Sequence, residues 1–141
     1  MNPETIIRMW FDDVWTQGKE ETIDRLMAAD ALVHDLPGTE AGPMQGRDAF
    51  KPFFRKFRGA FPDMRVEVVR TIAAGDLVAA QCRVSGTHSA DALGMGATGK
   101  RVEFTGMTIA RVQGDQIVEG WNCFDFLALY QQMGLLPELA V

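Results

Sequence analysis

Residues 100–126 read KRVEFTGMTIARVQGDQIVEGWNCFDF, and apolar and polar side chains alternate through most of this stretch. A period of two is typical of strands that bury one face. Gly114 and Asp115 stand between two such runs, 100–112 and 116–126, and this dipeptide is a short hairpin signal. The stretch therefore predicts two antiparallel strands joined by a tight turn.

The same pattern extends toward the N-terminus. A first run starts at Val66 and Val68, the dipeptide Gly75-Asp76 is a second hairpin signal, and residues 77–87 form the next run. The glycine-rich link 88–99 predicts a mobile loop at the rim of the sheet. We therefore expect four consecutive strands with antiparallel neighbours.

Helical spacing dominates the first part of the chain. Asn2 is a good N-cap and Pro3 suits the first helical position, so a helix is predicted from here to Gly18. A second short helix is expected over 19–27. Residues 31–34 indicate a brief extended piece.

Residues 35–46 are rich in proline and glycine and predict a loop. The next helix has one face made almost wholly of phenylalanine, at positions 50, 53, 54, 57 and 61. A last helix over 127–133 is expected to end at Gly134.

Helices followed by strands predict an α+β fold, with the N-terminal helices packed on a curved, mainly antiparallel sheet that encloses a pocket. The 141 residues are near the usual size of one domain, so residues 1–141 are expected to form a single domain. A hydrophobic content of 47% and a charged content of 23% are ordinary for a globular protein.

The charge and the cysteines limit the partners. A formal net charge of -5 lacks the cationic face that nucleic acid requires, so no nucleic acid partner is expected. No apolar run approaches the roughly 20 residues that span a bilayer, and no signal peptide is visible, so we expect no membrane partner. Cys82 and Cys123 stand in predicted strands without metal or disulfide spacing, which favours a reducing, cytoplasmic location.

Asp125 is the first candidate for chemistry. It stands between two phenylalanines where the last strand meets the following helix. Apolar neighbours that desolvate a carboxyl raise its pKa, which suits a general base. The same position suits an N-cap, whose side-chain oxygen accepts hydrogen bonds from free backbone N–H groups. On these residues alone, both roles stay open.

Two histidines and an asparagine are the other polar candidates. His34 precedes the predicted loop and is either an acid/base partner at the mouth of the cavity or a structural residue. His88 ends a strand and is either a pocket residue or a surface residue. Asn122 is three residues from Asp125, so a regular strand points their side chains to opposite faces. The histidines belong to no metal-ligand pattern and no nucleotide motif is present, so no metal and no cofactor are expected.

The cavity between helices and sheet is expected to bind a small hydrophobic molecule. Aromatic rings and thioethers supply its predicted walls, although most such residues belong to the core in any globular protein. The predicted binding pocket consists of Trp10, Trp15, Phe54, Phe57, Phe61, His88, Met107, Trp121 and Asn122.

Several short strings occur in the order and spacing of a known family. They are VHD (33–35), GRD (46–48), FPDM (61–64), SGTH (85–88), TGKRVEFTG (98–106) and IVEGW (117–121), with Asp125 after the last. On these strings, which extend from about residue 30 to Gly134, the chain resembles the SnoaL-like polyketide cyclases. That family is part of the superfamily that shares the cone-shaped fold of nuclear transport factor 2.

The resemblance implies a cone-shaped α+β barrel with a deep apolar pocket, a homodimer formed through the open sheet face, and catalysis without metal or cofactor. Studied members close a ring by an intramolecular aldol reaction, in which an aspartate near the end of the last strand is the general acid/base. Asp125 stands at the matching place, and His34 matches a polar pocket position. The implied function is acid/base cyclisation or enolisation of a hydrophobic, polyketide-like carbonyl compound.

Three other functions fit the same scaffold, because fold does not fix function. A steroid-isomerase or dehydratase type of enzyme would share the proton abstraction. An epoxide hydrolase of the limonene type would need an Arg and a second Asp near the first, and Arg101-Val102-Glu103 is the nearest approach in this chain. A non-catalytic module would bind a small molecule and use Asp125 only as a helix cap.

Overall fold

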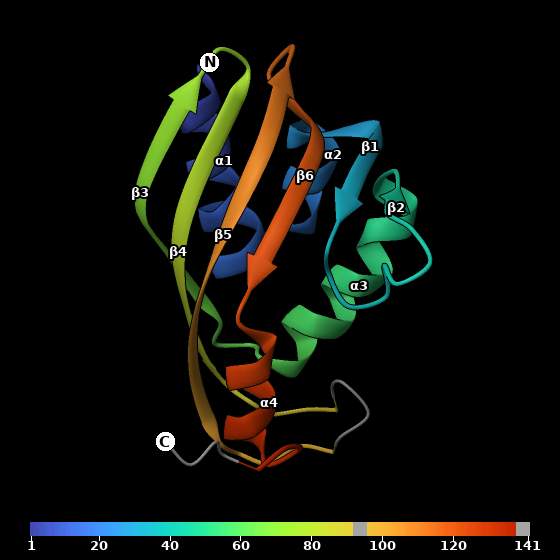
Figure 1. Cartoon of the computed structure of the whole chain (residues 1–141). Coiled ribbons are helices and arrows are strands. Elements are labelled where there is room, and N and C mark those ends of the chain that lie inside the picture. Colours follow the sequence, from blue (N-terminus) through green and yellow to red (C-terminus); the bar gives the residue numbers. More distant parts are fainter. Residues whose placement is uncertain (92–95, 138–141) are drawn as a thin grey trace.

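The structure, a computed structural model, describes residues 1–91 and 96–137. Its helices are α1 (Pro3–Met9), the π-helix η1 (Trp10–Thr16), α2 (Glu20–Leu26), α3 (Arg47–Ala60) and α4 (Phe126–Met133). Its strands are β1 (Met27–His34), β2 (Met44–Gln45), β3 (Arg65–Ala74), β4 (Leu77–Thr87), β5 (Arg101–Gln113) and β6 (Gln116–Phe124). Figure 1 shows the long strands side by side and the N-terminal helices behind them.

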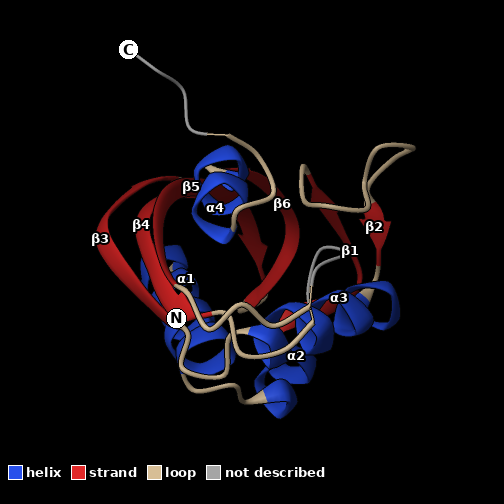
Figure 2. Ribbon diagram, turned by 90° about the horizontal axis from the view of Figure 1, so that it is seen from below, coloured by secondary structure: helices blue, strands red, loops and turns tan. Residues whose placement is uncertain are grey.

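The strands form one mixed sheet in the order β2-β1-β6-β5-β4-β3. The four consecutive strands β3 to β6 are antiparallel neighbours, as predicted, and tight turns at 75–76 and 114–115 join two of the pairs. The pair β1 and β6 is parallel. Because β2 and β3 stand at the two edges, the sheet is curved but open, and the barrel of the prediction is incomplete (Figure 2). The α+β class is confirmed.

The N-terminal helix begins and ends where the sequence predicts. Asn2 Oδ1 accepts a hydrogen bond of 2.8 Å from the backbone N–H of Thr5, and Pro3 takes the first helical position. The helix then continues without a break into η1, and Gly18 follows it with a φ of 71°. A left-handed φ favours glycine, which explains the stop. The buried stripe of α1 and η1 lies against β3 and β4.

The other helices close the concave side of the sheet and one of its ends. Figure 2 shows α1, α2 and α3 beneath the arch of strands, and Figure 1 shows α4 beyond the end of β6. α3 buries the phenylalanine face that its spacing predicts. α4 is held on β5 by Gln132, whose amide accepts from the N–H of Glu103 at 2.7 Å and donates to its carbonyl at 2.8 Å. As predicted, α4 ends at Gly134, which has a left-handed backbone.

Two boundaries differ from the sequence prediction. β1 starts at Met27 rather than at residue 31, because Met27 already pairs with Ile117 of β6. The predicted loop 35–46 contains the short strand β2, which pairs with β1. Part of the predicted rim loop, residues 92–95, lies outside the described residues. None of the described helices is long and apolar enough to cross a membrane.

Candidate functional site

A cavity lies between the concave face of the sheet and the helices. Its walls come from α1, η1, α3, α4 and the inward faces of all the long strands, and its water-accessible space is about 90 Å³. The lining is aliphatic and aromatic, with Thr108 and Asn122 as its hydroxyl- and amide-bearing members. No lining side chain of the described part of the chain titrates near neutral pH. The cavity is therefore an apolar space with one uncharged polar pair.

The two polar residues form a hydrogen-bonded chain. The hydroxyl of Thr108 donates to Asn122 Oδ1 at 2.8 Å, and Asn122 Nδ2 donates to the backbone carbonyl of His34 at 2.9 Å. Thr108 on β5 and Asn122 on β6 are direct partners in the antiparallel register. The side chain of Thr108 is buried, with 6% of the residue exposed. This chain fixes the position of the amide in the wall of the cavity.

Strand alternation brings these side chains to the cavity. On β6, Gly120, Asn122 and Phe124 line the cavity, whereas Trp121 and Cys123 do not. The expectation that Asn122 and Asp125 point to different sides agrees with this arrangement, because Asn122 lines the cavity and Asp125 does not.

Four of the predicted pocket residues meet at the cavity. Trp10, Trp15 and Phe57 line it from the helices and Asn122 from the sheet. The ring centroids of Trp15 and Phe57 are 6.2 Å apart at an interplanar angle of 90°, an edge-to-face arrangement that aromatic pairs favour. The helical stripe therefore is both core and cavity wall.

The other predicted pocket residues lie outside the lining. Phe54 and Phe61 are buried in the core behind it. Met107 and Trp121 lie on the other face of the sheet, because they alternate with the inward residues of β5 and β6. Met107 is 55% exposed.

His88 is fully buried and lies outside the cavity lining. Its Nδ1 accepts a hydrogen bond of 3.2 Å from the backbone N–H of Thr98, and its ring centroid is 5.5 Å from that of Phe61. Its Nε2 has no hydrogen-bond partner among the described residues. The alternative prediction, that His88 lies at the surface, is wrong. His88 instead joins the two ends of the rim loop.

His34 is half-buried and lies outside the cavity lining. Its Nε2 is 2.7 Å from Glu119 Oε2, and its ring stacks on Trp121 with centroids 5.5 Å apart and an interplanar angle of 4°. The part of His34 that takes part in the site is its backbone carbonyl, through the bond from Asn122.

Asp125 is the N-cap of α4. Its Oδ1 accepts a hydrogen bond of 3.0 Å from the backbone N–H of Ala128, and the residue is exposed. Its neighbours Phe124 and Phe126 line the cavity. The capping geometry is the alternative that the sequence left open, and it places the carboxylate outside the described lining.

Thr108 is the site residue that the sequence reasoning missed. It stands in the inward phase of β5, in which its neighbours Gly106 and Ala110 are also buried. The signal that could have revealed it is a hydroxyl residue at an inward-facing position of the strand, between two small apolar residues. Among the described residues, no three His, Cys, Asp or Glu side chains lie close enough together to hold a metal ion.

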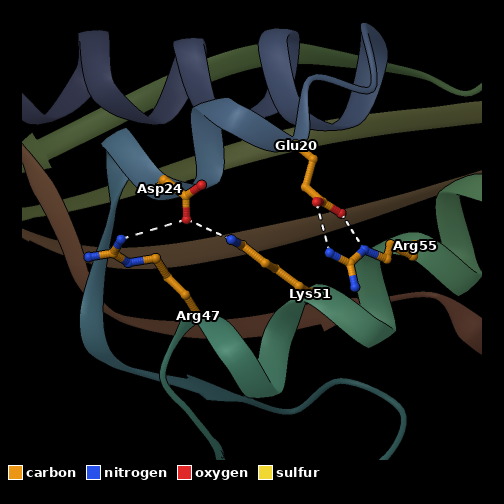
Figure 3. A network of polar contacts seen from close by, with 5 residues as sticks. All are labelled: Glu20, Asp24, Arg47, Lys51 and Arg55. Atoms are coloured by element: carbon orange, nitrogen blue, oxygen red, sulfur yellow. Dashed lines mark hydrogen bonds and ion pairs between the residues drawn. The ribbon is translucent and has the colours of Figure 1, made fainter.

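Ion pairs between α2 and α3 hold one wall of the cavity in place (Figure 3). Lys51 Nζ is 2.6 Å from Asp24 Oδ1, and Arg55 forms two hydrogen bonds, of 2.6 and 2.9 Å, with Glu20. The hydrogen bond from Lys51 lowers the pKa of Asp24, and that from Arg55 lowers the pKa of Glu20. Because these pairs are exposed, they orient α3 more than they stabilise the fold.

The model of the SnoaL-like polyketide cyclase family matches residues 5–133. The chain belongs to the SnoaL-like polyketide cyclase family. All residues that line the cavity lie within the matched part of the chain. No curated protein matches the chain.

Solved structures agree with this family. IdmH from Streptomyces antibioticus, described as a candidate polyketide cyclase, is 30% identical with a TM-score of 0.81, covering 95% of this chain and 99% of its own. A candidate polyketide cyclase from Acidithiobacillus ferrooxidans is 26% identical with a TM-score of 0.81, covering 94% of each chain. AclR from Streptomyces galilaeus, described as a candidate hydroxylase, is 23% identical with a TM-score of 0.83, covering 98% of this chain and 84% of its own, and shows the fold alone. This SnoaL-like domain therefore shares its fold both with proteins described as candidate polyketide cyclases and with one described as a candidate hydroxylase.

Proposed function

We propose that the protein binds a hydrophobic, polyketide-like carbonyl compound in the cavity and promotes its cyclisation without a cofactor. The observation that carries the proposal is the lining, which is apolar and aromatic except for the polar pair Thr108 and Asn122. Membership of the SnoaL-like polyketide cyclase family supports the reaction class.

The walls would supply most of the rate enhancement by holding the substrate folded. Ring closure of a flexible chain requires two carbons to meet, and an enclosed space that fixes them side by side removes much of the entropic barrier. Aromatic side chains such as Trp10, Trp15 and Phe57 suit an unsaturated or planar substrate.

The polar pair would stabilise charge on the substrate oxygen. Solvent water would remove the α-proton and later return a proton to the new alkoxide. As the enolate and then the new carbon–carbon bond form, negative charge develops on a carbonyl oxygen, and a fixed N–H donor in an apolar space stabilises that charge strongly. Asn122 has such a donor because its second Nδ2 hydrogen is not used by His34. Asp125 remains the alternative base, and its exposed position makes the two roles separable by experiment.

The experiment measures deuterium uptake in heavy water at the α-carbon of a panel of β-keto esters and aryl ketones. We expect the wild type to accelerate uptake, Asn122→Leu to lose about 100-fold of that acceleration, and Asp125→Asn to keep it. Loss in Asp125→Asn with Asn122→Leu unaffected would overturn the assignment of the polar pair in favour of Asp125.

The same panel tests catalysis against simple binding. Tryptophan fluorescence reports occupancy, because Trp10 and Trp15 line the cavity. Ligands that quench this fluorescence without any accelerated uptake or ring closure would establish a binding module instead of an enzyme.

We also propose a homodimer formed through the outer face of the sheet. Ile72 and Ile109 are exposed by 71% and 47%, and Met107 is exposed on the same face. Ile72 on β3 and Ile109 on β5 both pair with Ala79 of β4, the strand between them. Sedimentation velocity should show a dimer that Ile109→Lys converts to a monomer, and a monomeric wild type would overturn the proposal.

A further inference from the structure

The hydrogens of the polar pair can be assigned without ambiguity. The backbone carbonyl of His34 only accepts hydrogen bonds, so the group 2.9 Å from it must be the Asn122 amide nitrogen. The Asn122 oxygen then faces Thr108, and a carbonyl oxygen also only accepts. The single hydroxyl proton of Thr108 is therefore committed to Asn122.

This assignment leaves a single donor for a ligand, and the remaining groups only accept. Asn122 keeps its second N–H and one lone pair of Oδ1, and the Thr108 oxygen keeps both of its lone pairs. No other partner of either group occurs within residues 1–91 and 96–137. The two groups belong to directly opposite residues of β5 and β6, and both residues line the cavity.

A ligand that satisfies both groups needs a hydrogen-bond acceptor and a hydroxyl close together on an apolar body. A diketone has two acceptors and no donor, so it leaves the Thr108 lone pair without a partner. The enol of a 1,3-dicarbonyl has a carbonyl and an O–H on one planar three-carbon unit. It can exchange its internal hydrogen bond for two bonds to the protein.

We infer that the Thr108–Asn122 pair selects the enol form of a 1,3-dicarbonyl unit, with the ligand carbonyl accepting from Asn122 and the enol hydroxyl donating to Thr108. This inference rests on the proposed function and names the substrate class of that same site. Thr108 is a specificity-determining residue, because it orients Asn122 and accepts the hydroxyl.

Selection of the enol fits a cavity whose described lining has no titrating side chain. An enol is already a carbon nucleophile, and a protein that binds it better than the keto form shifts the population toward it. The tautomer pre-exists in solution, so no covalent step on the protein is needed. The ring closure would start from the bound enol, whose carbon attacks a second carbonyl while the enol proton passes to solvent water and water protonates the new alkoxide.

The test compares two ligands on three proteins. The ligands are 1-phenylbutane-1,3-dione, which enolises, and its 2,2-dimethyl derivative, which has no hydrogen between the carbonyls. The proteins are the wild type, Thr108→Val, which keeps the shape but removes the hydroxyl, and Thr108→Ser, which restores it. Fluorescence titration gives the affinities, and the ultraviolet absorption of the enol gives the tautomer in the complex.

The preference is the ratio of the affinities for the enolisable ligand and for its dimethyl derivative. We expect this ratio to be about tenfold higher in the wild type and Thr108→Ser than in Thr108→Val. The enol absorption should also rise on binding. The size difference between the ligands persists in Thr108→Val, so the change in preference isolates the hydroxyl. Butylbenzene should bind all three proteins equally, which controls for the shape of the cavity.

The outcomes separate this inference from the proposed function. Equal preference in the wild type and Thr108→Val, or binding without a rise in enol absorption, overturns enol selection and leaves the cyclase proposal in place. Enol selection in this test, with no accelerated deuterium uptake or ring closure by any member of the ketone panel, supports the inference and overturns the cyclase proposal. Absence of binding by every ligand, butylbenzene included, overturns both.

Discussion

The side-chain amide of Asn122 donates a hydrogen bond of 2.9 Å to the backbone carbonyl of His34, across the parallel pair of β6 and β1. The bond connects the cavity wall to the end of β1. On the opposite face of the sheet, the imidazole of the same His34 contacts Glu119. A residue expected to act through its side chain therefore contributes to the site through its backbone.

Replacement of Asp125 separates capping from catalysis. Asp125→Ala should lower the free energy of unfolding by about 1 kcal/mol, because the N–H of Ala128 loses its acceptor. Asp125→Asn should retain most of the stability, since asparagine caps as well as aspartate. Urea unfolding measures both variants, and equal stability of Asp125→Ala and the wild type would contradict the capping role.

Two inward-facing glycines should respond in opposite ways to added carbon. A Cβ at Gly106 would overlap the ring of Phe124 and stand 2.8 Å from its Cα, whereas nothing lies within 4 Å of a Cβ at Gly120. We expect Gly106→Ala to cost about 1–3 kcal/mol in urea unfolding and Gly120→Ala to be tolerated.

The larger change Gly120→Val should place a side chain in the cavity, because Gly120 lines it. We expect a folded protein with weaker ligand binding, measured by fluorescence titration against Gly120→Ala as the control. Unchanged affinity in Gly120→Val would show that the ligand does not occupy this part of the cavity.

The pairs between α2 and α3 predict a dependence of stability on pH. Both Glu20 and Asp24 have a lowered pKa in the folded protein, first because of hydrogen bonds from Arg55 and Lys51. A lowered pKa stabilises the fold above the unfolded-state value, and the contribution is lost as the pH falls through the folded-state value. The melting temperature of the double variant Glu20→Gln, Asp24→Asn should therefore be slightly below that of the wild type at pH 7, because exposed ion pairs contribute little. The difference should shrink as the pH falls below about 4 and vanish only below the lowered folded-state values, and a difference that stays the same from pH 7 to about pH 2 would contradict this origin.

The two cysteines should differ sharply in reactivity. Burial raises the pKa of the Cys82 thiol to about 12, whereas Cys123 is exposed on the outer face of the sheet. Because the thiolate is the reactive form and the proposed dimer would cover Cys123, iodoacetamide at pH 8 should modify Cys123 in the folded monomeric variant Ile109→Lys and Cys82 only after unfolding. Mass spectrometry of the digested protein gives the order, and Cys123→Ser is the control that should leave the folded protein unmodified.

The helices and strands could be predicted because their signals are local. The period of two after residue 65 and the phenylalanine face of α3 depend only on which neighbours are apolar. The first four residues of β1 were missed because Met27–Asp30 follow α2 directly, and only pairing with β6 makes them extended.

The candidate site could be predicted only in part. The helical spacing indicated Trp10, Trp15 and Phe57, which line the cavity because one face of an amphipathic helix must meet the sheet. Asp125 is flanked by aromatic residues in the sequence, yet sequence neighbours of a residue at a strand end do not reveal the side to which it points. Its exposure follows from its role at the start of α4.

By itself, the sequence determined the α+β class, the four antiparallel strands, the N-terminal helices and the aromatic character of the cavity, since each depends on local periodicity and on the burial of apolar side chains. The tertiary structure alone decided that Thr108, Asn122 and the carbonyl of His34 form one hydrogen-bonded chain. The physical reason why these three groups meet is strand pairing. The antiparallel register of β5 and β6 and the parallel contact of β6 with β1 bring together polar groups from distant parts of the chain, and hydrogen bonds act only at such short distances.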